Sequence, residues 1–499
     1  MMGACGGCHS RRAEITDAFV PGDSFWDHFG LTVPDETDLY YPDGQVRDED
    51  YEFASFLSSK MHDAGVRCWD CHEPHGAKPL LPGNALCMRC HGGVTTPSAP
   101  QIDPARHSFH KTESTGNQCI SCHMPQTAYM QRHWRHDHGF TIPDPALTLK
   151  HGIPNACNRC HNDKTTEWTR EAVDRWYGKR MDRASRLRAE ALASAKAGDE
   201  KVIPEVIRLA EGETNAVWRT VALNLLRRWG DQPGVKLSML HATKDERPLV
   251  RLAGLRGLEA ALMAGENDAL EAVRHLMADP ARTVRVDASW LLRANLDTNQ
   301  TGVRELVTSL RHNLDQPGGC MQWGIWLMDR QGAAAALPWF ERAVAWDPRS
   351  APLRDALAVA LSSLGRSAEA AAQLEVACRL APKEAGFFFK LGLARSEAGN
   401  LPQAILALEQ AVALDAGFSQ AWYNLGLARI RAEDPNGAIL ALNRAELLDP
   451  ASARVPYAMA TVLSNLGRRE EAVAAARRAL AIDPGFSAAR ELLEGLGRQ

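Results

Sequence analysis

The chain is 499 residues long, which is too long for a single hydrophobic core, and about three domains are expected. Its formal net charge of −4 argues against the strongly basic surface that nucleic-acid binding requires. No apolar run approaches the roughly 18 residues of a membrane-spanning helix. We therefore expect a multidomain protein with no membrane span in this chain and no nucleic-acid partner.

Residues 1–164 contain five copies of the pattern Cys-x-x-Cys-His, two of them close together between Met61 and His91. The copies are Cys5/Cys8/His9, Cys68/Cys71/His72, Cys87/Cys90/His91, Cys119/Cys122/His123 and Cys157/Cys160/His161. In this pattern two thiols form thioether bonds to the vinyl groups of a porphyrin, and the adjacent His ligates the iron. The sequence therefore predicts five covalently attached c-type haems.

Two other readings of the cysteines are weaker. A single Cys-x-x-Cys can be half of a zinc site or a redox dithiol. Structural zinc needs four ligands and usually pairs such units, which leaves five units unevenly matched and does not explain the His after every one. The two cysteines outside the motifs, Cys320 and Cys378, are predicted to be small buried helix residues.

The segment 1–164 is poor in aliphatic side chains. Ile, Leu and Val together are half as numerous over 1–165 as over 335–499, a stretch of the same length. So little apolar side chain cannot easily form a core, and haem macrocycles would supply the missing apolar surface. We expect short helical turns carrying the motifs, sparse secondary structure, and disorder without haem.

Nine further histidines in this segment are candidates for the second axial ligand: His28, His62, His75, His107, His110, His133, His136, His138 and His151. Ligation by two imidazoles fills both axial positions and disfavours reaction at iron. The ligands we predict are His28, His62, His75, His110 and His138, with His107 next. Met61, Met88, Met124 and Met130 are rival ligands, but packing is the preferred interpretation of each.

Several stretches around the motifs resemble those of a known group. They are Cys8-His9-Ser10-Arg11-Arg12, Ser59-Lys60-Met61-His62, Cys71-His72-Glu73-Pro74-His75, Cys122-His123-Met124-Pro125, Tyr129-Met130, Asp137-His138-Gly139-Phe140 and Pro154-Asn155-Ala156-Cys157. The segment resembles the multihaem c-type cytochromes of the doubled Cys-x-x-Cys-His and cytochrome c554-like groups that carry C-terminal tetratricopeptide repeats. The surplus of histidines favours electron transfer, whereas the resemblance supplies an enzymatic alternative, since related cytochromes include nitrite- and hydroxylamine-converting enzymes.

The resemblance also implies an earlier start, with a signal peptide and further haem motifs. Only Met1 to Ala4 precede the first haem cysteine, so a leader is expected upstream. Haem attachment normally follows export, which predicts a periplasmic or extracytoplasmic location. The alternative is a cytoplasmic protein whose motifs stay empty.

From 165 to 315 the sequence predicts amphipathic helices. A similar pattern recurs at nearly equal spacing in Val217-Trp218-Arg219, Val250-Arg251-Leu252-Ala253 and Asp279-Pro280 through Val284-Arg285. This spacing resembles HEAT-type helical pairs, with an extension of the next repeat class as the alternative.

From 316 to 499 a period of about 34 residues is explicit. It is marked by Pro348, Pro382, Pro450 and Pro484, by Ala336, Ala370, Ala404, Ala438 and Ala472, and by Ala343, Ala377, Ala411, Ala445 and Ala479. Ala416 takes the missing proline position, and Gly365, Gly399 and Gly467 fit a turn series that Glu433 breaks. Small residues let paired helices approach, Gly allows the turn, and Pro ends the second helix. These are tetratricopeptide repeats, expected to bind a partner protein.

The expected fold is mostly α: an irregular multihaem segment with sparse short helices (1–164), HEAT-like repeats (165–315) and tetratricopeptide repeats (316–499). The favoured function is electron transfer between redox partners docked on the repeats, with no catalytic residue set. The first alternative is a multihaem oxidoreductase for small nitrogen or sulfur compounds. It would need an open haem position, and Arg132, His133, Arg135 and His136 could line such a pocket. The second alternative is a repeat scaffold with a non-functional cytochrome part.

Overall fold

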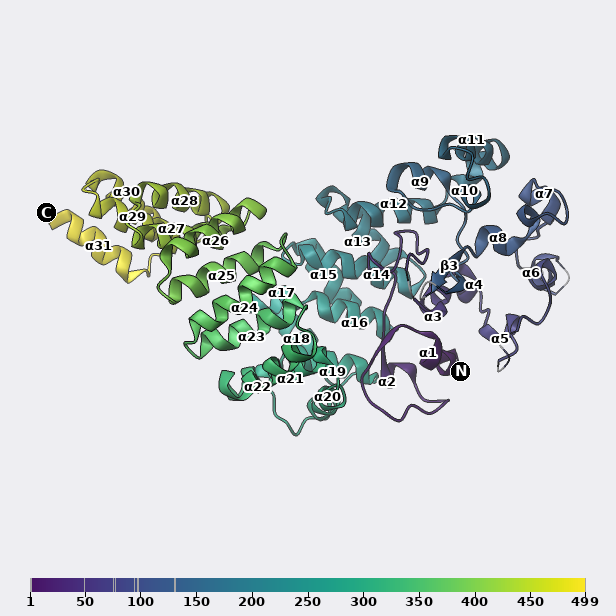
Figure 1. Cartoon of the computed structure of the whole chain (residues 1–499), viewed down its shortest axis with the longest axis horizontal. Coiled ribbons are helices and arrows are strands. Elements are labelled where there is room, and N and C mark those ends of the chain that lie inside the picture. Colours follow the sequence, from purple (N-terminus) through teal and green to yellow (C-terminus); the bar gives the residue numbers. More distant parts are fainter. Residues whose placement is uncertain are drawn as a thin grey trace. The chain divides into compact units, whose positions relative to one another are not determined.

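The computed structural model describes residues 2–48, 50–74, 76, 78–93, 95–96, 98–129 and 132–498. Helices dominate it, and the strands among these residues form two small antiparallel ribbons (Figure 1). The chain divides into two compact units, Met1–His312 and Asn313–Gln499. The predicted mostly-α fold class, short helices followed by a helical solenoid, is confirmed. The first unit holds both the haem-motif segment and the helices after it, and the division at 164 and 315 stays a prediction.

The haem-motif segment has short elements separated by long connections. Its helices are α1 (Met2–His9), α2 (Phe25–His28), α3 (Glu52–Leu57), α4 (Lys60–Asp63), α5 (Cys68–Cys71), α6 (Asn84–His91), α7 (Pro104–Ser108), η1 (Thr115–Asn117), α8 (Cys119–His123), α9 (Pro145–His151) and α10 (Cys157–Cys160). β1 (Arg12–Glu14) pairs with β2 (Phe29–Leu31), and β3 (Gln126–Tyr129) pairs with β4 (His133–His136). Most of these helices are a turn or two long, as the composition predicts.

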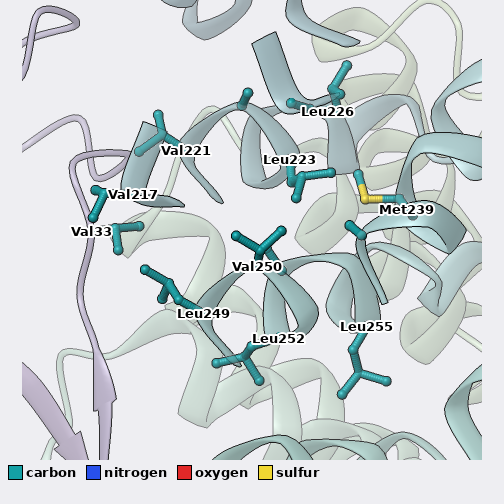
Figure 2. Close-up of a cluster of buried hydrophobic side chains, with 14 of the residues drawn as sticks. Val33, Val217, Val221, Leu223, Leu226, Met239, Leu249, Val250, Leu252 and Leu255 are labelled. Atoms are coloured by element: carbon teal, nitrogen blue, oxygen red, sulfur yellow. The ribbon is translucent and has the colours of Figure 1, made fainter. Parts of the chain in front are cut away.

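Apolar burial in this segment is confined to its two ends. Between Phe56 and Tyr129 no described Ala, Ile, Leu, Val, Met or aromatic side chain is buried. Several buried residues before this stretch, among them Phe25, Val33 and Phe53, share one cluster with the helices that follow. Figure 2 shows Val33 of this group beside Val217 and Leu249. The segment therefore has no core of its own, and its ends are held by the rest of the first unit.

Hydrogen bonds fasten the haem-motif segment to α14 (Ala216–Leu226). The indole Nε1 of Trp218 donates to the carbonyl of Ser58 at 2.8 Å, and Nδ2 of Asn215 donates to the carbonyl of Leu57 at 2.8 Å. Gly44, at φ +92, approaches the Trp218 ring so closely that a Cβ would lie 2.6 Å from it. Trp218 thus anchors two separate stretches of the N-terminal segment.

The rest of the first unit is helical. Its elements are α11 (Thr166–Tyr177), η2 (Gly178–Met181), α12 (Ala184–Lys196), η3 (Glu200–Val202), α13 (Ile203–Gly212), α14, η4 (Arg227–Trp229), α15 (Pro233–Ala242), α16 (Pro248–Gly257), α17 (Glu259–Met263), α18 (Asn267–Leu276), α19 (Arg282–Leu291), η5 (Arg293–Asn295) and α20 (Thr301–His312). The HEAT-type assignment stays a prediction, but the arginines of the recurring pattern share one kind of contact.

These arginines form a ladder across successive helices. Arg219 pairs with Asp245, and Arg251 pairs with Asp279 through bonds of 2.6 and 2.8 Å. Arg251 also donates to the carbonyl of Asp245, and Arg285 to the carbonyl of Asp279. Asp245 therefore connects Arg219 with Arg251, through its carboxylate and its carbonyl. Asp279 connects Arg251 with Arg285 in the same way.

Replacing Asp279 with alanine is expected to destabilise the first unit by about 3 kcal/mol, because Arg251 would remain buried without its carboxylate partner. Hydrogen exchange of α16 and α19 measures the change. Glu205, which pairs with Arg208 on the surface of α13, is the matched control, and Glu205→Ala should leave this exchange unchanged. Equal effects of the two substitutions would show that the ladder adds nothing beyond surface charge.

The second unit is a series of antiparallel helix pairs. Its elements are α21 (Pro317–Gln331), α22 (Ala333–Trp346), α23 (Ala351–Ser363), α24 (Ser367–Leu380), α25 (Ala385–Glu397), α26 (Leu401–Leu414), α27 (Ser419–Arg431), α28 (Pro435–Leu448), α29 (Arg454–Asn465), α30 (Arg469–Ile482) and α31 (Ser487–Arg498). The alanines of the two repeating series, Ala336 to Ala472 and Ala343 to Ala479, are completely buried where the paired helices meet. Cys320 and Cys378 are buried helix residues with free thiols, as predicted.

The turns between paired helices need a left-handed residue. Gly365, Gly399 and Gly467 adopt φ values of +74, +81 and +72. Glu433, which interrupts the glycine series, adopts the same conformation at φ +59. The backbone of the repeat is therefore kept even where the side chain makes this conformation costly. No helix among the described residues is both long and apolar enough to cross a membrane.

Candidate haem sites

Each motif lies on a turn of helix. Two cysteines three positions apart share one helix face, so both thiols can reach the same edge of a macrocycle. α1 and α6 carry their whole motifs, α8 carries Cys119 to His123, and in α5 and α10 the His follows directly after the helix. In all five motifs, both cysteines thus lie on one turn of helix.

Neighbouring motifs in the sequence are also neighbours in space. Burial and the nearby Cys5 thiol together raise the pKa of Cys68 to about 11. The nearby Cys87 thiol lowers the pKa of Cys119 to about 7. Burial raises the pKa of Cys71 and of Cys122, and Cys90 and Cys160 respectively lie close enough to these thiols to raise it further. The five motifs therefore form a linear series in chain order.

Three motif histidines face a second histidine. The ring centres are 6.2 Å apart for His72 and His138, 6.1 Å for His123 and His107, and 6.1 Å for His161 and His110. When two imidazoles bind one metal from opposite sides, each metal–nitrogen bond is about 2 Å and each nitrogen lies about 1 Å from its ring centre. The two ring centres are then about 6 Å apart. These pairs therefore fit one iron between two imidazoles.

In three of these six imidazoles the ring nitrogen on the other side is occupied. Nδ1 of His123 lies 2.9 Å from the carbonyl of Thr141, Nδ1 of His138 lies 2.8 Å from that of His136, and Nδ1 of His110 lies 2.6 Å from that of Ser108. Because a carbonyl only accepts, Nδ1 carries the proton and Nε2 is left as the ligand atom. Burial lowers the pKa of His123 and of His138, which keeps both imidazoles neutral and able to bind metal.

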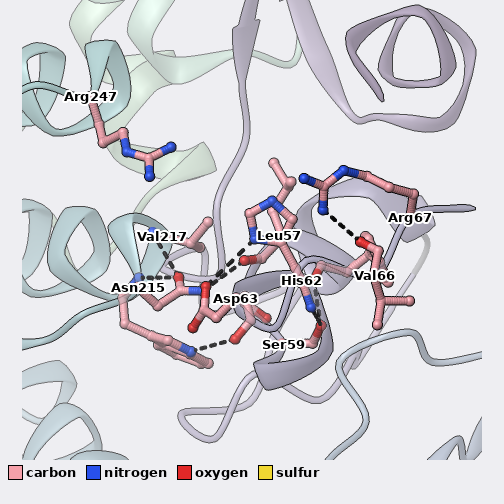
Figure 3. A network of polar contacts seen from close by, with 12 residues as sticks. Leu57, Ser59, His62, Asp63, Val66, Arg67, Asn215, Val217 and Arg247 are labelled. Atoms are coloured by element: carbon pink, nitrogen blue, oxygen red, sulfur yellow. Dashed lines mark hydrogen bonds and ion pairs between the residues drawn. The ribbon is translucent and has the colours of Figure 1, made fainter. Parts of the chain in front are cut away.

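Of the predicted second ligands, His107, His110 and His138 thus lie opposite motif histidines, whereas His28 and His62 lie elsewhere. His28 packs against Phe19, with Nε2 3.2 Å from Asp23. His62 packs against Phe56 with Nδ1 3.6 Å from Asp63, which in turn accepts from Asn215 (Figure 3). Both remain predicted ligands without an assigned motif.

Other candidates have different positions. His75 and Met130 lie outside the described residues. His136 is engaged through both ring nitrogens, by the carbonyl of Met124 and by Gln126. His151, which was not among the predicted ligands, has a buried Nε2 without a hydrogen-bond partner among the described residues. Nδ1 of His28 and Nδ1 of His62 are likewise buried without a hydrogen-bond partner among the described residues. His151 thus shares this feature with two predicted ligands, and the sequence carries no sign of it.

Among the described residues, no three His, Cys, Asp or Glu side chains gather into a group that could hold a bare metal ion. At each motif, two thiols and one imidazole instead lie on or next to a single helical turn. At three motifs a second imidazole lies about 6 Å from the first. This arrangement fits the thioether bonds and axial ligands of haem c. When bound there, haem supplies one-electron redox chemistry.

A buried carboxyl group lies near these sites. Asp50 is completely buried, neither of its oxygens has a hydrogen-bond partner in the part of the chain that the structure describes, and burial raises its pKa to about 7. The unfolded value is about 3.9. Between these values the folded protein binds more protons than the unfolded chain, so this group's contribution to stability is present at low pH and is lost as the pH rises.

Asp50→Asn is therefore expected to raise the free energy of unfolding at pH 8 by about 4 kcal/mol, and by less than half of that at pH 5. Urea unfolding at the two pH values measures both increments. Asp38→Asn removes the same charge at an exposed position and should change neither. An equal gain at pH 5 and pH 8 would mean that the ionisation of Asp50 is not responsible.

Comparisons with known proteins match two parts of the chain. A family model described as "Doubled CXXCH motif" matches residues 62–96, and one described as "Tetratricopeptide repeat" matches residues 453–486. No curated protein matches the chain.

Solved structures cover about a third of the chain. One titled "Crystal structure of MamA protein" has 22% identity over 35% of this chain and 95% of its own, with a TM-score of 0.33. YrrB, described as a TPR protein with an unusual peptide-binding site, has 18% identity over 37% of this chain and 95% of its own, also at 0.33. TTC0263, a thermophilic TPR protein of Thermus thermophilus, has 22% identity over 37% of this chain and 100% of its own, at 0.29. The chain thus combines a doubled CXXCH motif, the signature of multihaem c-type cytochromes, with tetratricopeptide repeats.

Proposed function

We propose that the chain is an electron-transfer protein, which carries single electrons between redox partners on five covalently attached haems. The observation that carries this proposal is the linear series of motifs, in which each motif lies beside the next one of the sequence. A series of this kind supports transfer from one end of the segment to the other, through the whole length of the motif-bearing chain.

The histidine pairs support transfer over catalysis. His72 with His138, His123 with His107 and His161 with His110 would each occupy both axial positions of an iron. An iron with two imidazole ligands has no free position for a substrate and changes little in structure on reduction. Three of the five proposed sites therefore have the ligand set of an electron carrier.

The repeats are the proposed docking surface for a redox partner. Stacked helix pairs present an extended surface that other repeat proteins use for binding. Because haem is normally attached after export, we place the working protein in the periplasm or another extracytoplasmic space.

Electron paramagnetic resonance of the exported, haem-loaded protein tests the proposal. We expect a mass increase of five haems and only low-spin ferric signals. A high-spin signal that shifts with nitrite or hydroxylamine would instead support the multihaem oxidoreductase. If the exported protein lacked the absorption of reduced c-type haem, the chain would instead be a repeat scaffold with a non-functional cytochrome part.

A further inference from the structure

The histidine of the first motif has a carboxylate beside it. Nδ1 of His9 lies 3.6 Å from Oε2 of Glu52, the first residue of α3. This oxygen is buried and has no hydrogen-bond partner at shorter range among the described residues. Oε2 thus has the His9 imidazole beside it, and the same carboxylate also acts on His138 and Arg135.

The other carboxylate oxygen fixes the orientation of Glu52. Oε1 lies 3.4 Å from Nη1 of Arg135 on β4, and the guanidinium of Arg135 lies 4.4 Å from the centre of the Tyr129 ring. Tyr51 packs against Tyr129 at 6.2 Å on the same side. Glu52 is thus held between a cation and an imidazole, with two aromatic rings packed beside the cation.

A carboxylate is a different kind of acceptor from the backbone carbonyls found at two other motifs. Nδ1 of His91 lies 2.9 Å from the carbonyl of Pro100, and Nδ1 of His123 lies 2.9 Å from that of Thr141. A hydrogen bond to a charged acceptor is stronger than one to a neutral carbonyl and makes the imidazole a more basic ligand. A more basic axial ligand stabilises ferric iron and lowers the reduction potential.

We propose that Glu52 accepts the Nδ1 hydrogen bond of His9 and lowers the reduction potential of the haem held by Cys5 and Cys8. The inference rests on haem attachment at this motif, which is part of the proposed function. Glu52 acts through His9 and is a positioning and tuning residue. A low potential at this end of the series would favour the passage of electrons from the first motif toward the second.

The test is a potentiometric titration of the loaded protein, followed by electron paramagnetic resonance. Glu52→Gln keeps the size of the side chain and removes its charge. We expect the ferric signal of the first haem to titrate at a higher potential and to shift more than any other signal, since Glu52 also acts on His138. Glu305→Gln is the matched control, since Glu305 is similarly buried against an arginine, Arg285, and contacts no motif histidine. It should leave every potential unchanged.

Arg135→Gln provides a second variant with the opposite expected sign. Without the guanidinium, the full charge of Glu52 acts on His9, and the same signal should titrate at a lower potential. Unshifted signals in both variants, or an equal shift of all signals in Glu52→Gln, would overturn the inference and leave the proposed function intact. Peptide mass spectrometry that finds no haem on Cys5 and Cys8 would overturn both.

Discussion

Replacing His138 with alanine is expected to convert one haem of the loaded protein from the low-spin to the high-spin ferric form. His138 lies opposite His72, at the ring separation that two ligands of one iron require. Alanine cannot coordinate, so one axial position would open to water or an added ligand. The expected loss is the low-spin signal of one haem, with a new site that binds cyanide or imidazole.

His136 provides the control for this substitution. It lies two positions earlier in the chain, but its ring nitrogens contact the Met124 carbonyl and Gln126. His136→Ala should therefore leave the spin state of every haem unchanged. If His138→Ala kept all haems low-spin, or if the two variants lost the same signal, the pairing of His138 with His72 would be wrong.

The parts of the molecule that were predictable from the sequence are those with local causes. A cysteine pair and its histidine act within a single helical turn, so the five motifs could be located without knowledge of the fold. The alanine and proline positions recur at a constant period because each repeat packs only on its neighbours. Even Glu433, an exception in the sequence, follows the backbone of the repeat.

The pairing of histidines could not be predicted because it depends on contacts between distant parts of the chain. His138 and His72 are far apart in the sequence, and nothing in the residues around either one marks the other. Histidine enrichment gave a pool of candidate ligands that includes His107, His110 and His138. It carried no information on which member of the pool faces which motif.

Glu52 was missed for a related reason. A glutamate at the first position of a helix is ordinary, since it interacts favourably with the helix dipole. Only the packing of α3 against α1, together with Arg135 from a strand much later in the chain, places its carboxylate beside His9. Trp218 is a similar case, since the anchoring of Ser58 by its indole is visible only in the fold.

The largest structural effect is expected from the absence of haem. Ordering the backbone from Phe56 to Tyr129 costs conformational entropy at every residue, and apolar burial is the usual source of the free energy that offsets this cost. No described Ile, Leu, Val, Met or aromatic side chain between these two residues is buried. Local hydrogen bonds, such as those of Asn84 with Asn117 and Cys119, contribute only about 1 kcal/mol each.

We therefore expect residues 60–128 to be unfolded in protein made without haem attachment, while the buried helices of both units stay folded. Hydrogen exchange read by mass spectrometry, with the loaded protein as reference, should show amides of this stretch exchanging at the rate of an unstructured chain. Helices α21 to α31 are an internal control, because their repeating alanines are buried against neighbouring helices and need no cofactor. If residues 60–128 were equally protected with and without haem, the macrocycles could not be the apolar interior of this segment.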